Sequence, residues 1–320
     1  MRLEQLEVFV TVVEKRSFSE AALELGLSQA GVGRAVEALE ADLGGRLLKR
    51  GRFGAQPTAL GERVVAHART ILHLREAMRQ EVSLEREHQA LRGVLRIGTF
   101  SSVARQVVVP LTLELQRQHP DLAVRIVEDS FLRLEEMLHA GQVDVAFIRR
   151  RKEGQDTLIL HDLWTDLGVA LLPKTAEPPK PSVSWEDLAT HPIIIKEGAV
   201  CLETIDAFFA HAPVPLEASY AAKNEQTVVS MTAQGLGIGL AFRLAVEPLP
   251  QTVYAASLPA PMTRTAAVAV LPTSLKIPAV STFLSMLREG SPVRLLQRLL
   301  EEYAHNLQPS ILGVSQLVQP

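Results

Sequence analysis

The 320-residue sequence predicts a chain of class α plus α/β, with a helical N-terminal part and a larger C-terminal part of strands and helices. Up to about residue 43 the apolar residues recur at helical steps of three and four. Residues 59–87 contain no proline and a single glycine, which is typical of one long helix. From Gly93 onward strand patterns alternate with helix patterns. A hydrophobic content of 47% supports a sizeable core, and the length fits two or three domains.

Composition excludes several classes of protein. The longest apolar runs, such as "LGVALLP" at 167–173, have the length of a strand, and charged residues open the chain, so we expect no membrane span, no signal peptide and a cytoplasmic location. A single cysteine, Cys201, excludes a disulfide framework and a multi-cysteine metal site. The net charge of -3 hides a local basic segment at 44–63, whose charged residues are Arg46, Lys49, Arg50, Arg52 and Arg63 against Glu62 alone.

The first three predicted helices have the spacing of a helix-turn-helix. Counted from Phe18, the fifth residue is Ala22, the ninth is Gly26 and the fifteenth is Val32. Two crossing helices need a small residue, a turn glycine and a branched apolar residue at such places. An ordinary helical hairpin is the other interpretation, but the basic segment that follows favours DNA binding.

The third helix, "SQAGVGRAVEALE" at 28–40, carries Gly31 and Gly33 in its first two turns. Each glycine costs a helix about 1 kcal/mol relative to alanine. Both would permit a close approach to DNA in the major groove. Ser28, Gln29 and Arg34 are the predicted contacts, because glutamine suits adenine and arginine suits guanine or phosphate.

The segment "GGRLLKRGRFGAQPT" at 44–58 resembles a wing that grips phosphate. Lys49, Arg50 and Arg52 lie close together on it, and Thr58 caps the next helix or meets the backbone of DNA. A solvated loop with incidental arginines is the alternative. Phosphate contacts of this type supply salt-dependent affinity without reading sequence.

The long helix from Ala59 has an apolar stripe that predicts a dimer seam. Packing against the body of the protein itself is the alternative. The residues of this stripe are Leu60, Val64, His67, Ile71, Leu74, Met78 and Val82.

The C-terminal part is expected to hold two subdomains joined by crossing strands, with a cleft at the carboxyl ends of the strands. Expected strands are "VLRIGTF", "AVRIVED", "VDVAFI", "GVALLP", "PIIIKE", "ASYAAK", "LGIGLAF" and "RTAAVAVLP", and expected helices are 103–118, 131–140, one from Trp185, one after Cys201, one through Val228 and the last at 280–290. Two strand-to-helix junctions put polar groups beside helix N-terminal N–H groups, which suits a small anion, although simple capping explains them too. The candidate ligand contacts are Thr99, Ser101, Ser102, Ser130, Phe147 and Cys201.

Four stretches together resemble the LysR-type transcriptional regulators. They are "FVTVVEKRSFSEAALELGLSQAGVGRAVEALEADLGGRLLKR" at 9–50, "PTALGE" at 57–62, "GQVDVAFI" at 141–148 and "GLGIGLA" at 235–241. The resemblance implies a winged helix-turn-helix at 1–58, a linker helix and hinge at 59–92 that dimerises, and an effector domain at 93–290. That domain would consist of two Rossmann-like α/β subdomains of the periplasmic-binding-protein type, with subdomain I at about 93–162 and 264–290 and subdomain II at about 163–263. Assembly into a tetramer is also implied.

Three features depart from the family pattern. Gly33 and Leu48 stand where the family usually has serine and phenylalanine, so phosphate binding at Gly33 is in doubt. Residues 291–320 form an extension that we expect to be helical. The segment around Cys201 is similar to that of the peroxide-sensing OxyR branch, but Val200, Glu203 and Ala210 replace that branch's histidine, arginine and resolving cysteine. A one-cysteine sensor acting through sulfenic acid is therefore an alternative function.

We expect a DNA-binding regulator controlled by a small effector. Its partners would be an operator with two half-sites, the effector and further copies of the chain, with RNA polymerase as another candidate. No cofactor, metal site or catalytic motif is indicated, although an α/β enzyme is an alternative of a different class. A metabolite-binding protein without DNA function would leave the first ninety residues unexplained.

Overall fold

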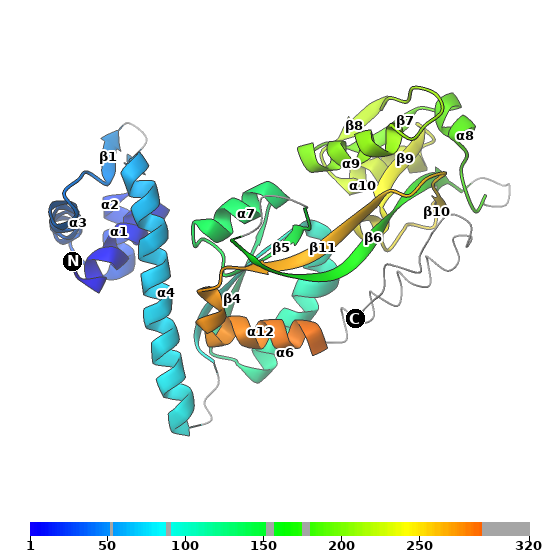
Figure 1. The fold of residues 1–320 in the computed structure, drawn as a ribbon. Coiled ribbons are helices and arrows are strands. Elements are labelled where there is room, and N and C mark those ends of the chain that lie inside the picture. The colour runs from blue at the N-terminus through cyan, green and yellow to red at the C-terminus, as the bar shows by residue number, and fades with distance from the viewer. Residues whose placement is uncertain (52–53, 88–90, 152–156, 175–179, 290–320) are drawn as a thin grey trace.

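The computed structural model describes residues 1–51, 54–87, 91–151, 157–174 and 180–289. Three helices and a two-stranded antiparallel sheet form the N-terminal domain, followed by one long helix (Figure 1). These elements are α1 (Leu3–Lys15), α2 (Phe18–Leu25), α3 (Gln29–Leu43), β1 (Leu48–Gly51), β2 (Gly54–Pro57) and α4 (Ala59–Glu87). The arrangement is the predicted winged helix-turn-helix and linker helix.

Local signals set the boundaries of these helices. The hydroxyl oxygen of Ser17 accepts from the backbone N–H of Glu20, and Gly26 ends α2 with φ of 64°. Phe9, Val32 and Leu39 are fully buried in a shared core, as the spacing predicted. The three helices therefore pack through the residues that carried the sequence pattern.

The apolar stripe on α4 has two parts with different surroundings. Leu60, Val64 and Ile71 pack partly against the core of the N-terminal domain. Further along, Leu74 is 37% exposed and Met78 is 60% exposed. Packing against the chain's own body thus explains the first half of the stripe. Further on, Leu74 borders a small cavity with Leu271 and Ile277 of the C-terminal domain, and Met78 is open to solvent. The side chain of Val82 lies outside the described part.

The C-terminal domain is built on a nine-stranded mixed sheet in the order β4-β3-β5-β11-β6-β9-β7-β8, with β10 also paired to β6. Its strands are β3 (Gly93–Thr99), β4 (Leu122–Glu128), β5 (Val145–Arg149), β6 (Ile159–Pro173), β7 (Ile193–Lys196), β8 (Tyr220–Ala222), β9 (Ile238–Phe242), β10 (Val253–Ser257) and β11 (Thr263–Val270). The long strand β6 pairs with β11 over its first half and with β9 and β10 over its second half.

Strands β6 and β11 run between two bodies (Figure 1), which we call subdomain I, with β3, β4 and β5, and subdomain II, with β7, β8 and β9. Strand β10 was not predicted, and β6 begins earlier than expected, because both are fixed by pairing with distant strands. The helices are α5 (Ser101–Val103), η1 (Ala104–Val108, a π-helix), α6 (Val109–Gln118), α7 (Phe131–His139), α8 (Trp185–Thr190), α9 (Ala199–Phe209), α10 (Glu225–Ala233), α11 (Arg243–Val246), η2 (Ser274–Lys276, a 3-10 helix) and α12 (Pro278–Glu289).

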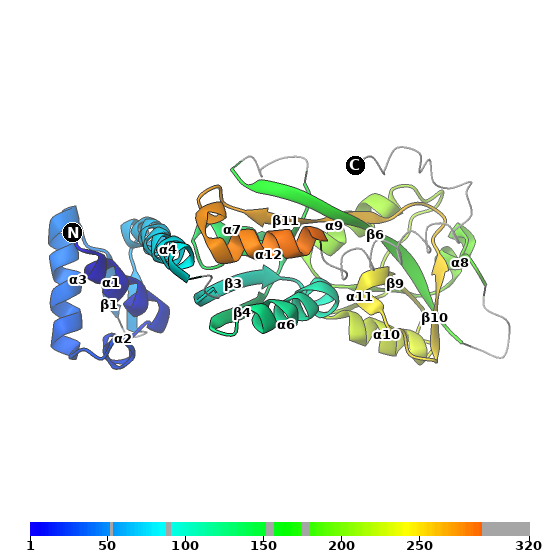
Figure 2. The same ribbon diagram turned by 90° about the horizontal axis from the view of Figure 1, so that it is seen from below.

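The final helix α12 returns to subdomain I, as the sequence predicted. It packs with α6 on one face of the sheet, where Phe283 is fully buried. Helix α7 covers the other face through Leu134 and Leu138. Seen from below, α4 lies between the N-terminal helices and subdomain I (Figure 2).

Candidate functional site

Helix α3 presents an exposed surface at its N-terminal end. The hydroxyl oxygen of Ser28 accepts from the backbone N–H of Gly31 at 3.1 Å, which makes Ser28 the N-cap. A Cβ at Gly31 would lie 3.2 Å from that oxygen, so this glycine leaves room for the cap. Apart from the neighbouring backbone of α3, no described residue has an atom within 4 Å of a Cβ built at Gly33. The helix cap at Ser28 therefore accounts for Gly31, whereas no described contact accounts for Gly33.

A hollow surrounds Gly33. Gln29 and Arg34 are exposed at its edge, and Phe18 and Glu37 complete it. The hollow has a volume of about 520 Å³ and opens to solvent, so a projecting group of a partner can enter it. The predicted contact residues Gln29 and Arg34 thus come together on one open face of α3.

The wing holds Lys49 exposed on β1, while the side chains of Arg50 and Arg52 lie outside the described residues. Thr58 has a structural role: its hydroxyl donates to the carbonyl of Arg46 at 2.8 Å and accepts from the N–H of Gly61 at 2.9 Å. Thr58 therefore caps α4 and ties it to the wing, as the capping interpretation predicted.

The predicted ligand contacts at the end of β3 have unequal exposure. Thr99 is fully buried, and its hydroxyl donates to the carbonyl of Phe100. Ser101 is half-buried, whereas Ser102 is only 2% exposed. The Ser102 hydroxyl oxygen accepts from Nη2 of Arg264 at 3.3 Å. Of this group, Ser101 is the residue with an accessible side chain.

Arg264 was not predicted, because its partners are far away in the sequence. Its Nε and Nη2 donate to Oδ2 of Asp166 at 3.0 and 2.6 Å, and both residues are buried. The guanidinium lies 4.2 Å from the ring centre of Phe242 and 5.3 Å from that of Phe100. This ion pair therefore lies on the crossing strands β6 and β11 and contacts both subdomains.

Arg149, also missed from the sequence, joins the subdomains directly. It ends β5 in subdomain I and reaches α9 in subdomain II, donating to Thr204 Oγ1 at 2.7 Å and to Glu203 Oε2 at 3.0 Å. Glu203 is the residue that replaces the arginine of the OxyR branch. At the end of β7, Lys196 forms an ion pair with Glu225 at 2.7 Å. We use the name carboxyl-end cluster for four residues on different elements, of which Arg149 and Thr204 are in direct contact. They are Ser101 after β3, Arg149 at the end of β5, Lys196 at the end of β7 and Thr204 on α9.

Two predicted ligand contacts have other surroundings. Phe147 is fully buried and packs edge-on against Phe283, with ring centres 6.3 Å apart, so the expectation that it lines the cleft is wrong. On an alternating strand its side chain points into the core that α12 covers. Ser130 is exposed before α7, where its N–H donates to Asp129 Oδ1.

Cys201 lies in the first turn of α9. This helix begins at Ala199 rather than after Cys201, because Gly198 has φ of 130° and allows the chain to turn earlier. The side chain of Cys201 lies outside the part that the structure describes.

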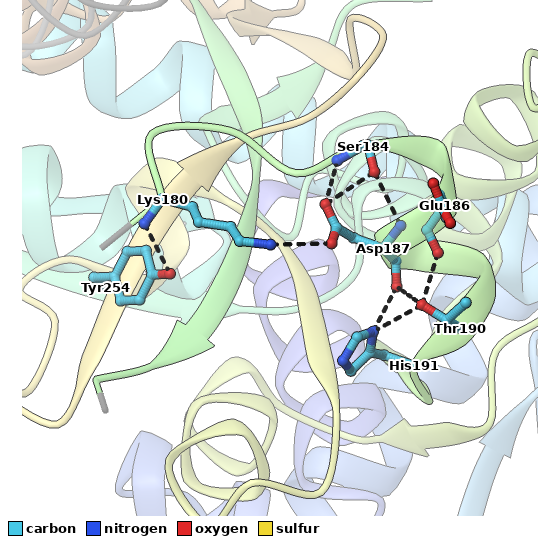
Figure 3. Close-up of polar contacts among 7 residues, drawn as sticks. All are labelled: Lys180, Ser184, Glu186, Asp187, Thr190, His191 and Tyr254. Carbon is cyan, nitrogen blue, oxygen red and sulfur yellow. Dashed lines mark hydrogen bonds and ion pairs between the residues drawn. The ribbon is translucent and has the colours of Figure 1, made fainter. Parts of the chain in front are cut away.

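A serine, an aspartate and a histidine lie at α8, but Ser184 and Asp187 form the capping box at its N-terminal end and His191 is its C-cap residue (Figure 3). Asp187 accepts from the N–H and hydroxyl of Ser184, which holds the pKa of its carboxyl below the ordinary range. The hydrogen-bond partner of His191 Nδ1 is the backbone carbonyl oxygen of Asp187, at 2.8 Å, rather than the Asp187 carboxylate. The geometry is therefore not that of a catalytic triad.

Within the described ranges, no cluster of three His, Cys, Asp or Glu side chains could hold a metal ion. The same ranges contain no helix that combines the length and the apolar character needed to cross a membrane.

Comparison with known families covers nearly the whole chain. Residues 3–62 match the family described as bacterial regulatory helix-turn-helix protein, lysR family, and residues 88–292 match the LysR substrate binding domain. The chain is 40% identical over 293 residues to the probable HTH-type transcriptional regulator LrrA of Synechococcus elongatus, covering 91% of this chain and 98% of that one. It is 30% identical to a probable hydrogen peroxide-inducible genes activator of Mycobacterium avium over 75% of this chain and 78% of the relative.

Solved structures share the fold. Full-length OxyR from Pseudomonas aeruginosa superposes with a TM-score of 0.73 at 21% identity, covering 92% of this chain and 97% of that one. CbnR in complex with its target DNA superposes with a TM-score of 0.60 at 18% identity, covering 90% and 99%. The chain belongs to the LysR family: it is a DNA-binding transcriptional regulator with a C-terminal effector-binding domain.

Proposed function

We propose that the effector is a small anion, such as a carboxylate, that binds at the carboxyl-end cluster between the subdomains. The observation that carries this proposal is the pairing of Arg149 with Glu203 and Thr204. The guanidinium of Arg149 is 19% exposed and holds a carboxylate of the chain itself, whereas Glu203 is 64% exposed. An effector carboxylate can take the place of Glu203, because the exposed glutamate is free to turn to solvent.

The remaining members of the cluster support an anion. Lys196 carries a second positive charge, which is paired with Glu225, and the half-buried Ser101 offers a hydroxyl donor at a strand end. A cavity of about 20 Å³ between Lys196, Glu225 and Met262 has room for one water molecule. Ligand that binds one arrangement of the subdomains more tightly than another shifts the population toward it.

A thermal-shift screen tests this proposal. The probes are small mono- and dicarboxylates, with chloride at equal ionic strength as the reference. A ligand at one hundred times its Kd stabilises the native state by about 2.7 kcal/mol. We expect a carboxylate that raises the Tm of the parent and of Arg133→Gln, an exposed arginine on α7, but not of Arg149→Gln. A carboxylate that stabilises all three proteins equally would place the site elsewhere.

On the DNA side, we propose that Gln29 and Arg34 read bases in each of two half-sites and that Lys49, Arg50 and Arg52 contact phosphate. The exposure of Leu74 and Met78 on α4 supports pairing of two chains there, and such a dimer would present two copies of α3, one to each half-site. Tetramer formation, contact with RNA polymerase and a cytoplasmic location remain part of this proposal.

A redox function is a second candidate. The M. avium relative is named as a hydrogen peroxide-inducible genes activator, and Cys201 lies in the first turn of α9, where a helix N-terminus favours the thiolate. The absence of a second cysteine from the sequence excludes an intramolecular disulfide. Mass spectrometry after mild peroxide treatment decides: an unmodified Cys201 with unchanged DNA binding overturns this function.

A further inference from the structure

Besides its apolar stripe, helix α4 carries polar side chains that contact both domains. Arg69 is one of them. The Arg69 side chain is 7% exposed. Its Nη1 donates to the carbonyl oxygen of Ala140 at 3.0 Å, and its Nη2 donates to Oε1 of Glu14 at 3.3 Å. Ala140 follows α7 in the effector domain, whereas Glu14 belongs to α1 of the DNA-binding domain. One buried guanidinium therefore joins the two domains.

The chain is shaped to let α4 approach the effector domain closely at this point. Gly141 has φ of 62°, and a Cβ added to it would lie 3.0 Å from Cβ of Arg69. Four residues after Arg69 and on the same helix face, His73 lies 2.8 Å from Arg96 and 3.3 Å from Asp144. Both of these partners are in subdomain I, so two turns of α4 are seated on it.

Strand β5 connects this junction with the carboxyl-end cluster. Asp144 directly precedes the strand, and Arg149 ends it. Residues 145–148 are fully buried between the covering helices. A buried, paired strand of five residues moves as a unit, because its packing and its ladder allow little internal change. Displacement of Arg149 therefore moves the turn that Arg69 holds.

We propose that Arg69 is a positioning residue that fixes the DNA-binding domain relative to the effector domain, and that β5 carries to it the state of the carboxyl-end cluster. The second part rests on the effector site proposed above. Arginine suits this position because its planar fork offers donors in two directions, which a single ammonium group does not. Its Nε has no hydrogen-bond partner within the described residues, so the cost of burying this guanidinium is only partly compensated.

Pulsed electron paramagnetic resonance on the full chain tests the first part. Spin labels are placed at Ser19→Cys on α2 and Gln116→Cys on α6, both exposed, in a Cys201→Ser background. Labelled chains are mixed with an excess of unlabelled chains, so that only distances within one chain contribute. We expect one narrow distance in the parent, a broadened distribution in Arg69→Met, and no change in Arg79→Met, an exposed arginine on the same helix.

A second variant guards against misfolding of Arg69→Met. Glu14 is 45% exposed, so Glu14→Gln is compatible with the fold and removes only the charge that Arg69 meets on α1. Glu14→Gln should broaden the distance distribution as well. The distribution of the double variant should be no broader than that of Arg69→Met alone. Narrow, unshifted distances in both single variants would overturn the role of Arg69.

The relay through β5 needs its own measurement. We expect Arg149→Gln to shift the distance in the parent but to cause no further shift in Arg69→Met. Equal shifts in both backgrounds, or no shift in the parent, would overturn the relay. Neither effector nor DNA is added, so a failure to find a carboxylate ligand is a separate result that leaves this measurement intact.

Discussion

Nη1 of Arg96 lies 2.8 Å from Nε2 of His73. Because a guanidinium only donates hydrogen bonds, Nε2 is the acceptor and the imidazole is neutral, with its proton on Nδ1 facing Asp144 at 3.3 Å. Burial, with help from Arg96 and Arg69, lowers the pKa of His73, although Asp144 and Glu14 oppose this shift. The contact between α4 and the effector domain therefore depends on a neutral histidine.

This dependence predicts that acid weakens the junction. A histidine whose pKa is lowered by docking stabilises the docked state above its ordinary pKa of 6.5, and that contribution is lost as the pH falls through the lowered value. In the spin-label experiment described above, the distance should broaden when the pH falls from 7.5 to about 5.5. His73→Gln should remove most of this pH dependence, whereas His67→Gln, at an exposed position on the same helix, should keep it.

Asp144 is a second titratable group in the same junction. Comparing the pH dependence of the parent with that of His73→Gln separates the contribution of His73 from that of Asp144. Burial raises the pKa of the Asp144 carboxyl, so this group contributes the opposite slope with pH. A parent that keeps one narrow distance down to pH 5.5, or a His73→Gln variant that broadens as the parent does, would contradict the prediction.

The sequence predicted the N-terminal domain well because that domain depends on local signals. Phe18, Ala22, Gly26 and Val32 act within fifteen residues of one another, and each has the predicted place. The C-terminal contacts that matter most join residues far apart: Arg264 meets Ser102, 162 residues away, and Arg149 meets Thr204, 55 residues away. Spacing in the sequence carries no record of such pairs.

Single-residue burial was equally hard to predict. Phe147 belongs to a strand that is apolar on both faces. The sequence therefore does not show which side chains of this strand enter the core and which reach the boundary between the subdomains. Arg149, two residues later on the same strand, was the residue at the boundary between the subdomains.

The open hollow at Gly33 predicts that serine is tolerated there. Apart from the neighbouring backbone of α3, no described residue has an atom within 4 Å of the added Cβ, and a serine in the helix is intrinsically more favourable than glycine by a few tenths of a kcal/mol. Gly33→Ser should bind a duplex selected from random sequence by the parent several-fold more tightly, measured by fluorescence anisotropy. Weaker binding at unchanged Tm would mean that DNA fills the hollow. Gly31→Ser, which would crowd the Ser28 cap, serves as the unfavourable control.

Arg34 and Lys49 should contribute to DNA binding in different ways. A phosphate contact adds about 0.9 to the magnitude of the slope of log K against log salt. Because the proposed dimer carries two copies of Lys49, Lys49→Ala should reduce this slope by about 0.9 for each half-site, or about 1.8 in total, and should weaken binding to all sequences alike. Arg34→Ala should cost about 1–3 kcal/mol on the selected duplex and relax the preference at one base pair of each half-site. Arg133→Ala on α7 is the control, and equal behaviour of all three variants would contradict this division.

The ion pair of Arg264 and Asp166 should contribute less to the free energy of unfolding than the loss caused by replacing either residue alone. Arg264→Met leaves a buried carboxylate whose remaining described donors include the N–H of Leu244, and such a change costs about 3–5 kcal/mol. Replacing both residues, as Arg264→Met with Asp166→Leu, removes the uncompensated charge and should restore much of the stability. Urea unfolding of the parent, the two single variants and the double variant measures the coupling. Additive losses would mean that the two side chains act independently, against the 2.6 Å contact between them.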